Sequence, residues 1–321
     1  MNTLRIGIAG LGRLGRVHAE NIACKIPGAR LTAACTTRPE TLEYARQLGV
    51  TALYTDFNKM LAEAEIDAVA VVTTSSEHCW QIEAALDAGK HVFSEKPLGV
   101  DIAQCLQAQA AVECHPELVF MLGFMRRYDP SYAYAKRQVD AGVIGTPYLV
   151  KATGLDPEAV VEDAIRFCKN SGGIFLDAAI HDIDLMRWFL GSEASEVYAL
   201  GATFKHPEFR QAGDDEMGLA VFRFENGAMG TVHVGRTCPY GYHVETEIVG
   251  TEGTLRISAV PEKNLARVYG PGGVRAECVA SFPERFREAY LLEMQRRLAR
   301  EHSVIMDGRD IGTVVLPDAE V

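Results

Sequence analysis

Short apolar runs alternate with amphipathic segments along the first third of the chain. The runs predict strands, and the segments with apolar residues at helical spacing predict helices. The predicted strands are Leu4–Ala9, Leu31–Cys35, Asp67–Val72, His91–Ser94 and Leu118–Phe124, and the predicted helices are Arg16–Cys24, Glu40–Leu48, Glu77–Ala88 and Asp101–Glu113. This alternation is typical of a parallel sheet with helices on both faces.

The pattern changes after about residue 123. Helical spacing predicts helices over Ser131–Ala141 and Asp177–Leu190, and Asn226-Gly227 and Thr251-Glu252-Gly253 predict hairpin turns. The strands predicted around these turns are Val197–Phe204, Met217–Phe224, Ala228–Arg236, Val244–Val249, Thr254–Ile257 and Ala266–Tyr269. We therefore expect an α/β protein with three parts: an N-terminal Rossmann fold with a parallel sheet (1–123), a C-terminal α+β domain with a largely antiparallel open sheet (124–302), and an atypical tail (303–321).

Composition narrows the class of protein. The 321 residues carry a net charge of −11 with no basic block, which argues against nucleic acid or an anionic membrane as partner. No apolar run approaches the length of a membrane span, and the N-terminus lacks the features of a signal peptide. The eight cysteines show neither CxxC pairs nor zinc spacing. We expect a cytoplasmic protein without disulfides or bound metal.

A glycine-rich turn separates the first predicted strand from the first predicted helix. Gly10, Gly12 and Gly15 form a GxGxxG fingerprint, in which the glycines permit a tight turn, close approach of a pyrophosphate and close packing of helix on strand. The pattern occurs by chance in other folds, but its place in this alternation favours a dinucleotide site. The candidate cofactor-binding residues are Gly10, Gly12, Arg13, Leu14, Gly15, Thr36, Thr37, Arg38, Thr73, Glu95 and Lys96.

The end of the second predicted strand bears on the choice of cofactor. An acidic residue there normally holds the ribose 2′-hydroxyl of NAD, but residues 33–39 contain none. Thr36 and Thr37 can donate hydrogen bonds to a 2′-phosphate, and Arg38 can pair with it. The loop therefore favours NADP, with NAD as the alternative. Alternatively, Arg38 is a solvent-exposed loop residue with no role in cofactor binding.

Two further patterns carry candidate chemistry. Glu95-Lys96-Pro97 follows the predicted strand His91–Ser94 directly, at the carboxyl edge of the sheet where ligands bind. Asp177 and His181 are four residues apart, so on a helix they share a face, where the carboxylate can orient a basic imidazole. A helix-capping aspartate and a core histidine would give the same spacing. A metal site from Asp177, His181 and Asp184 fits no standard ligand motif.

Taken in order, these motifs resemble the Gfo/Idh/MocA oxidoreductase family. The resemblance rests on GxGxxG, Glu95-Lys96-Pro97 and the stretch Gly-Gly-x-x-x-Asp-x-x-x-His that begins at Gly172, and it covers roughly residues 3–297. Within the family the chain is most similar to inositol 2-dehydrogenases. Supporting matches lie at 123–129, 240–242, 247–250, 285–286 and 289–290.

The resemblance implies that hydride passes from a carbinol carbon of a cyclic polyol or sugar to a nicotinamide. His181 would take the hydroxyl proton, Asp177 would orient that histidine or bind an adjacent hydroxyl, and Lys96 would polarise the reacting oxygen. The implied substrate-binding residues are Lys96, Arg126, Asp177, His181, Tyr242 and Tyr290. A homo-oligomer, dimer or tetramer, is expected by analogy. A non-catalytic sensor and a cofactor-retaining glycoside hydrolase on the same scaffold are the alternatives.

The chain departs from the pattern of its relatives in three places. The acid after the second strand is missing, and Thr153-Gly154-Leu155-Asp156 stands where relatives carry a more polar pocket edge. Residues 303–321 resemble a piece of cytidylate kinase, although no Walker-type loop occurs elsewhere in the chain. We hypothesise a fusion or frameshift at about residues 298–304.

Overall fold

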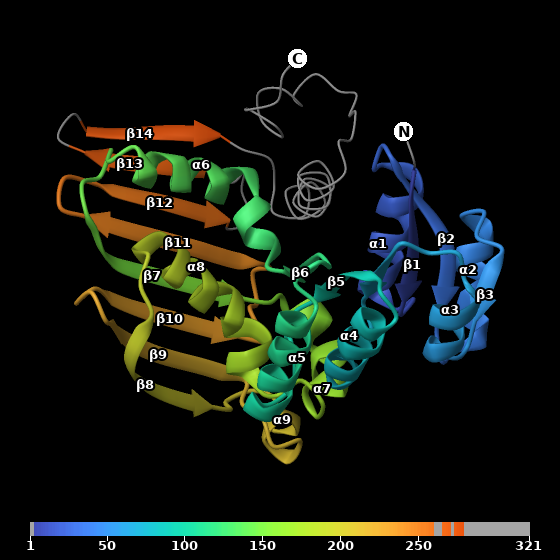
Figure 1. Cartoon of the computed structure of the whole chain (residues 1–321). Helices are drawn as coiled ribbons and strands as arrows, with labels where there is room; N and C mark the ends of the chain where they lie inside the picture. The colour runs from blue at the N-terminus through green and yellow to red at the C-terminus, as the bar shows by residue number, and fades with distance from the viewer. Residues whose placement is uncertain (1–2, 260–264, 271–272, 279–321) are drawn as a thin grey trace. The chain divides into compact units, whose positions relative to one another are not determined.

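The computed structural model describes residues 3–259, 265–270 and 273–278. These residues belong to two compact units that divide between Gly123 and Phe124 (Figure 1). Each unit is described by itself. The predicted site residue Tyr290, the matches at 285–286 and 289–290, and the tail 303–321 lie outside the described residues.

The first unit is built on a six-stranded sheet in the order β3-β2-β1-β4-β5-β6, in which every neighbouring pair is parallel. The chain winds outward from β1 in one direction and from β4 in the other, so the strand order reverses between these two. Ligands of open α/β sheets bind at the carboxyl ends of the strands beside such a reversal. The strands are β1 (Leu4–Ala9), β2 (Ala29–Cys35), β3 (Ala52–Tyr54), β4 (Ala68–Val71), β5 (His91–Glu95) and β6 (Phe120–Gly123).

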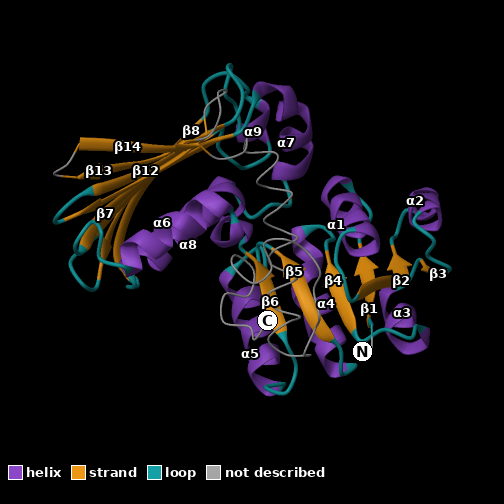
Figure 2. Ribbon diagram, turned by 90° about the horizontal axis from the view of Figure 1, so that it is seen from above, coloured by secondary structure: helices purple, strands orange, loops and turns teal. Residues whose placement is uncertain are grey.

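Helices cover both faces of this sheet. Figure 2 shows α1 and α2 on one face and α3, α4 and α5 on the other. Because both faces are covered, strand residues such as Ile6, Ile8 and Val71 are almost completely buried, which explains the unbroken apolar runs in the sequence. The helices are α1 (Arg13–Cys24), α2 (Leu42–Gln47), α3 (Phe57–Glu63), α4 (His78–Asp87) and α5 (Ile102–Cys114), with short 3-10 turns at Pro39–Thr41 and Ser75–Glu77.

The second unit is built on an eight-stranded sheet in the order β14-β13-β12-β11-β7-β10-β9-β8. Neighbouring strands are antiparallel except β7 and β10, which run parallel at the centre. The strands are β7 (Pro147–Leu155), β8 (Ala194–Ala202), β9 (Met217–Phe224), β10 (Met229–Gly235), β11 (His243–Gly250), β12 (Thr254–Ala259), β13 (Leu265–Gly270) and β14 (Gly273–Cys278).

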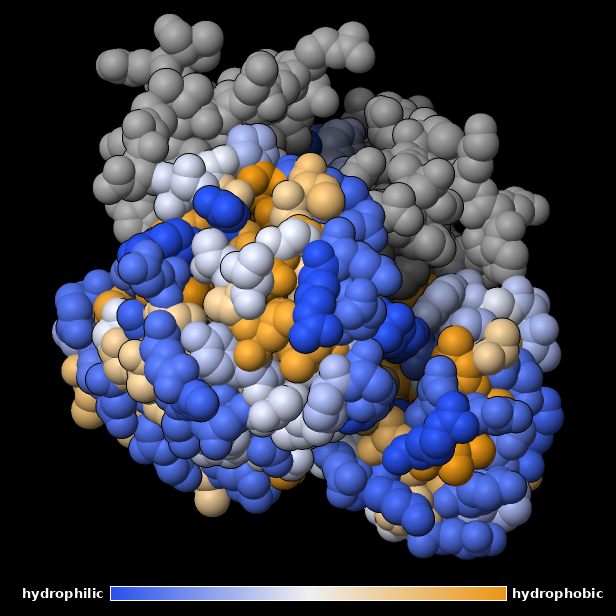
Figure 3. Space-filling model, turned by 90° about the vertical axis from the view of Figure 1, so that its right-hand side faces the viewer, coloured by the Kyte–Doolittle hydropathy of each residue, from blue (hydrophilic) through white to orange (hydrophobic). Residues whose placement is uncertain are grey.

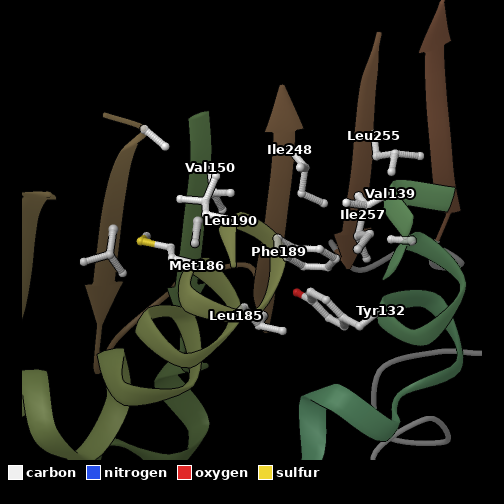
Figure 4. Close-up of a cluster of buried hydrophobic side chains, with 14 of the residues drawn as sticks. Tyr132, Val139, Val150, Leu185, Met186, Phe189, Leu190, Ile248, Leu255 and Ile257 are labelled. Atoms are coloured by element: carbon white, nitrogen blue, oxygen red, sulfur yellow. The ribbon is translucent and has the colours of Figure 1, made fainter. Parts of the chain in front are cut away.

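One face of this sheet is covered by α6 (Pro130–Asp140) and α8 (Ile180–Leu190), and Figure 2 draws no helix along the opposite face of the described strands. In Figure 4, Val150 and Ile248 point from the strands toward Leu190 and Phe189 of α8. The remaining helical segments are η3 (Met125–Tyr128), η4 (Glu158–Val160), α7 (Val161–Cys168), η5 (Phe175–Ala179) and α9 (Glu208–Gln211).

The predicted fold class is confirmed in both units. The hairpin turns also form: Gly227 adopts φ +85° between β9 and β10, and the Gly250 N–H donates to the Gly253 carbonyl (2.8 Å) between β11 and β12. The prediction missed β3, α3, β7, α7, α9 and β14. It was also wrong about the start of the helix at 177–190, because Phe175–Ala179 forms a π turn that precedes α8.

The surface drawn in Figure 3 is mostly hydrophilic, with apolar side chains in small groups between polar ones. Scattered apolar side chains are normal on a protein surface and need no special explanation. In the part of the chain that the structure describes, no helix is both long and apolar enough to cross a bilayer.

Candidate functional site

The glycine loop packs against its own unit so tightly that two of its positions admit no side chain. Gly10 has φ +94°, and a Cβ there would meet the backbone of Val72 and Thr73 at the end of β4. A Cβ on Gly15 would meet the carbonyl of Gly10. Gly10 therefore allows the tight turn, and Gly15 lets α1 approach the strand, as the fingerprint predicts.

Gly12, in contrast, faces open space. It is the N-cap of α1, and a Cβ there would have one described atom within 4 Å, Nη2 of Arg38 at 3.6 Å. The free N–H groups at the start of a helix attract anions, and the missing Cβ leaves room for a pyrophosphate beside them. The loop thus fits a dinucleotide, and the Arg38 guanidinium adds a positive charge at the same place.

The threonines beside Arg38 differ in their accessibility. Thr36 is buried, and its Oγ1 accepts hydrogen bonds from the Arg38 N–H (3.2 Å) and the Thr41 hydroxyl (3.2 Å). Thr37 is exposed. Thr36 therefore shapes the loop from inside, whereas Thr37 and Arg38 remain accessible to the adenosine side of a cofactor.

A buried pair that the sequence did not suggest lies in the same unit. His18 of α1 and Glu95 at the end of β5 are both buried, with 2.8 Å between Nε2 and Oε1. The other oxygen of Glu95 accepts a hydrogen bond from the Lys96 N–H (3.2 Å). This pair ties the first helix to the segment that carries Lys96. A direct cofactor contact by Glu95 stays a prediction.

His78 is a second missed residue. Its Nδ1 lies 2.7 Å from the Pro97 carbonyl and its Nε2 lies 3.3 Å from the Thr73 carbonyl, so it links the segments that follow β5 and β4. Burial lowers the pKa of His78, so the ring is neutral at neutral pH and donates to one carbonyl at a time. The Lys96-Pro97 peptide is cis. His78 therefore connects Thr73 to Pro97, the residue that follows Lys96, and both Thr73 and Lys96 are predicted cofactor-binding residues.

In the second unit, the π turn carries Asp177 and α8 carries His181. Single π turns within helices are rare and occur frequently at functional sites. Asp177 is partly exposed and His181 is half-buried. Asp177 and His181 are four positions apart, so they lie on neighbouring turns of one continuous helical segment. That Asp177 orients His181 as a general base stays a prediction.

Asp177 is held by a residue that no motif indicated. Nη1 of Arg236, just after β10, donates to Oδ2 of Asp177 (2.9 Å), and Nη2 donates to Oδ2 of Asp214 (2.6 Å). Arg236 and Asp214 are both buried. These residues are 59 and 37 positions from Asp177 in the sequence, so only the tertiary fold brings them together.

Arg126, a predicted polyol contact, forms a buried ion pair with Asp182. Both side chains are almost completely inaccessible, and burial raises the pKa of Asp182 even though Arg126 opposes the shift. The neighbouring Arg127 holds Asp184 through two hydrogen bonds (2.8 and 2.6 Å). Arg126 thus has a partner inside the protein, and a contact with substrate stays a prediction.

The remaining predicted residues occupy the ends of strands. Tyr242 is half-buried just before β11, and the neighbouring Tyr240 hydroxyl lies 2.8 Å from Nδ1 of His243. Gly154 of β7 lies under the Arg126–Asp182 pair, because a Cβ there would be 2.9 Å from Oδ2 of Asp182. Across the described ranges, no cluster of His, Cys, Asp and Glu is arranged to hold a metal ion.

Comparison with known proteins gives matches to both units. Residues 4–124 match the model of an oxidoreductase family with an NAD-binding Rossmann fold, and residues 132–256 match the GFO/IDH/MocA C-terminal domain. A scyllo-inositol 2-dehydrogenase (NAD(+)) of Bacillus subtilis is 38% identical over 91% of this chain and 84% of its own. A myo-inositol 2-dehydrogenase of Thermotoga maritima is 35% identical over 91% of this chain and 86% of its own.

A solved structure gives the same likeness. The scyllo-inositol dehydrogenase of Lactobacillus casei, with bound NAD(H) and scyllo-inositol, has a TM-score of 0.82 and 48% identity over 91% of this chain and 87% of its own. The C-terminal segment matches a different family, because residues 274–321 match a cytidylate kinase model. The predicted resemblance of the tail is confirmed, and the matched segment begins inside β14.

Proposed function

Because the chain belongs to the Gfo/Idh/MocA oxidoreductase family, we propose that it oxidises a ring hydroxyl of an inositol-like polyol with a nicotinamide dinucleotide. The proposal rests on the likeness, over nine-tenths of the chain, to relatives named as inositol dehydrogenases. The glycine loop and the Asp177–His181 segment supply the residues that this chemistry needs. The polyol is converted to a ketone, and one proton is released for each hydride transferred.

His181 is the proposed general base. Its imidazole accepts the hydroxyl proton as the carbon–hydrogen bond breaks, and Asp177 stabilises the imidazolium that forms. When bound, the nicotinamide ring supplies the acceptor for the hydride. The role of Lys96 in polarising the reacting oxygen, and contacts of Arg126, Tyr242 and Tyr290 with substrate, are further parts of the proposal.

We propose NAD as the working cofactor. The preference for NADP that the loop sequence predicts finds no support among the relatives, one of which is named for NAD(+) and another of which holds NAD(H). The position of Arg38 beside Gly12 also suits charge neutralisation at the pyrophosphate, which both cofactors share. The ratio of kcat/KM for the two cofactors decides between them, and a ratio above one in favour of NADP would restore the original prediction.

Reduced-nicotinamide absorbance across a panel of polyols tests the proposed function. The panel holds scyllo-, myo- and chiro-inositol with several aldoses, each with NAD and with NADP. We expect turnover with at least one inositol. Binding of cofactor without turnover of any polyol favours the sensor, and turnover of glycosides without release of free reduced cofactor favours the hydrolase.

We further propose that the protein is a cytoplasmic homo-oligomer that uses the uncovered face of the second unit's sheet. The location is consistent with the seven described cysteines, which are all free thiols. The pairing of β8 with β9 sets Tyr198 beside Val221 and Leu200 beside Leu219 on this face, and all four are about half exposed. Contiguous exposed apolar side chains mark interaction surfaces.

A further inference from the structure

Asp177 belongs to a chain of three charged groups that runs inward from the candidate site. Asp177 has a side-chain exposure of 14%, Arg236 of 3% and Asp214 of 4%. Arg236 donates to both carboxylates, and its Nη2 also lies 3.4 Å from the Ser171 hydroxyl. Asp177 is thus the outermost member of the group and the one that remains accessible.

Asp214 also fixes the backbone from which Asp177 projects. Its Oδ1 accepts hydrogen bonds from the N–H of Ile174 (2.8 Å) and of Asp215 (2.9 Å). Ile174 directly precedes the π turn, and the Asp177 N–H donates to the Gly173 carbonyl (2.9 Å). The main chain of the turn is therefore anchored through Asp214, while the side chain of Asp177 is anchored through Arg236.

The charges in this group do not cancel. Two carboxylates share one guanidinium, so the group carries a net charge of −1. Burial would lower the pKa of Arg236, but the two carboxylates outweigh that effect and the pKa is raised, so Arg236 stays charged. The Cys168 thiol of α7 lies near the same groups, and burial raises its pKa, so it stays neutral.

We propose that Arg236 and Asp214 are positioning residues that fix the direction of the Asp177 carboxylate and set how much negative charge it presents to His181. The positive charge of Arg236 partly compensates the negative charge of Asp177, and the negative charge of Asp214 partly compensates that of Arg236. The basicity of His181 then depends on two buried residues that do not reach the substrate. This proposal deepens the proposed function, because it concerns the same general base.

Opposite shifts in the pKa of His181 distinguish this role from a purely structural one. Arg236→Met leaves the charge of Asp177 uncompensated, which stabilises imidazolium and raises the pKa of His181 by about one unit. Asp214→Asn leaves Arg236 paired with Asp177 alone and lowers that pKa. An asparagine keeps the oxygen that accepts from Ile174 and Asp215. Arg236→Lys keeps the positive charge but loses the forked geometry of the guanidinium. In this variant we expect the pKa of His181 to stay near the wild-type value and kcat to fall.

Titration of the histidine side chains by NMR in the full-length protein measures these shifts without any need for turnover, and His181→Gln assigns the signal. Arg187→Met is the matched control, because Arg187 also lies on α8 and pairs with a carboxylate, Glu193, but at an exposed site (2.6 and 2.7 Å). We expect no shift in that control.

Shifts of opposite sign in the Arg236→Met and Asp214→Asn variants support the proposal. Values within about 0.2 unit of wild type in both, or shifts of the same sign, overturn it. If Arg236→Met does not fold, the Asp214→Asn variant alone tests the proposal. A lower pKa of His181 in that variant supports the proposal, and an unchanged or higher pKa overturns it. The pH profile of kcat/KM on inositol should follow the NMR values. A failure to oxidise any polyol would contradict the proposed function while leaving the titration result intact.

Discussion

His181 lies about one turn beyond Asp177 in the same helical segment. Asp177 is held by Arg236, whereas His181 is half-buried on α8. In the proposed mechanism a fixed carboxylate matters, since the base must reach a substrate proton without changing its own orientation.

Replacement of His181 by alanine removes the proposed proton acceptor. We expect kcat to fall on the order of a hundredfold or more, the usual size of a general-base contribution. Steady-state kinetics on inositol measures the fall. Cofactor affinity, measured by fluorescence quenching, should stay at the wild-type value because the glycine loop is untouched. Turnover close to wild type would remove His181 from the mechanism.

The buried ion pair of Arg126 and Asp182 is expected to affect the stability of the fold. Arg126→Met leaves a buried carboxylate without its counter-charge, and we expect a loss of about 3–5 kcal/mol in the free energy of unfolding. Asp182→Asn in the same chain should recover part of the loss, because a neutral amide costs less to bury. Chemical denaturation of both single variants and the double variant measures the coupling. Arg187→Met, which breaks an exposed pair, should change the free energy by less than about 1 kcal/mol.

At the scale of elements, the sequence predicts what depends on periodicity and misses what depends on neighbours. The strands β1, β4 and β9 follow from their own apolar pattern. Strand β7 is central, yet its inward positions include the small residues Ala152 and Gly154, because the Arg126–Asp182 pair fills the space above Gly154. Small inward residues give a weak hydrophobic signal. The π turn depends on a hydrogen-bond pattern that periodicity does not record.

The same limit applies to the candidate site. GxGxxG, Lys96 and the Asp177–His181 spacing are local patterns and can be found in the sequence. His18, His78 and Arg236 carry no local signature, because each acts on a partner from a different strand or loop. Their partners become adjacent only when the sheet forms.

One carboxylate also organises the loop between β8 and α9. Glu216 accepts hydrogen bonds from the N–H groups of Phe204 (2.9 Å), Lys205 (2.7 Å) and His206 (3.1 Å), and from the Thr237 hydroxyl (2.8 Å). Burial alone would raise the pKa of Glu216, but these donors outweigh it and hold the pKa below its ordinary value. The ionised form of Glu216 therefore stabilises the folded state.

The pH dependence of stability tests this role. The contribution of Glu216 is fully present above the pKa of an unfolded glutamate, about 4.3, and is lost as the pH falls through the lower folded value. We expect Glu216→Gln to cost about 2 kcal/mol at neutral pH and progressively less as the pH falls toward 3. Denaturation curves across that range measure it. A difference from wild type that does not change with pH would contradict the assignment.

At the scale of the whole molecule, helices of the described residues cover one sheet face of the second unit, and none of them covers the other. The edge strand β8 is exposed along nearly its whole length, with Tyr198 and Leu200 on the uncovered face and Val197 on the other. A net charge of −11 opposes association of copies at low ionic strength, and the exposed apolar side chains of this face are the attraction that the proposed oligomer would use.

A charge placed on the uncovered face should disrupt the proposed oligomer. We expect Leu219→Glu to shift the protein to a smaller species, as measured by light scattering after size-exclusion chromatography. Val197→Glu is the matched control, because Val197 is also more than half exposed but points to the other face of the sheet. An unchanged mass in the Leu219 variant, or equal dissociation in both, would place the interface elsewhere.

The π turn at Phe175–Ala179 also bears on how such a site can change by insertion and deletion. A π turn is an α-helix that has gained one residue. Because the bulge absorbs the extra residue, deleting one residue there would let α8 continue as regular α-helix while the turns on either side keep their present faces. A carboxylate three or four positions before His181 would still share its face. A deletion further along α8 has no bulge to absorb it, and it would rotate every residue on one side of the gap by about 100° about the helix axis relative to the other.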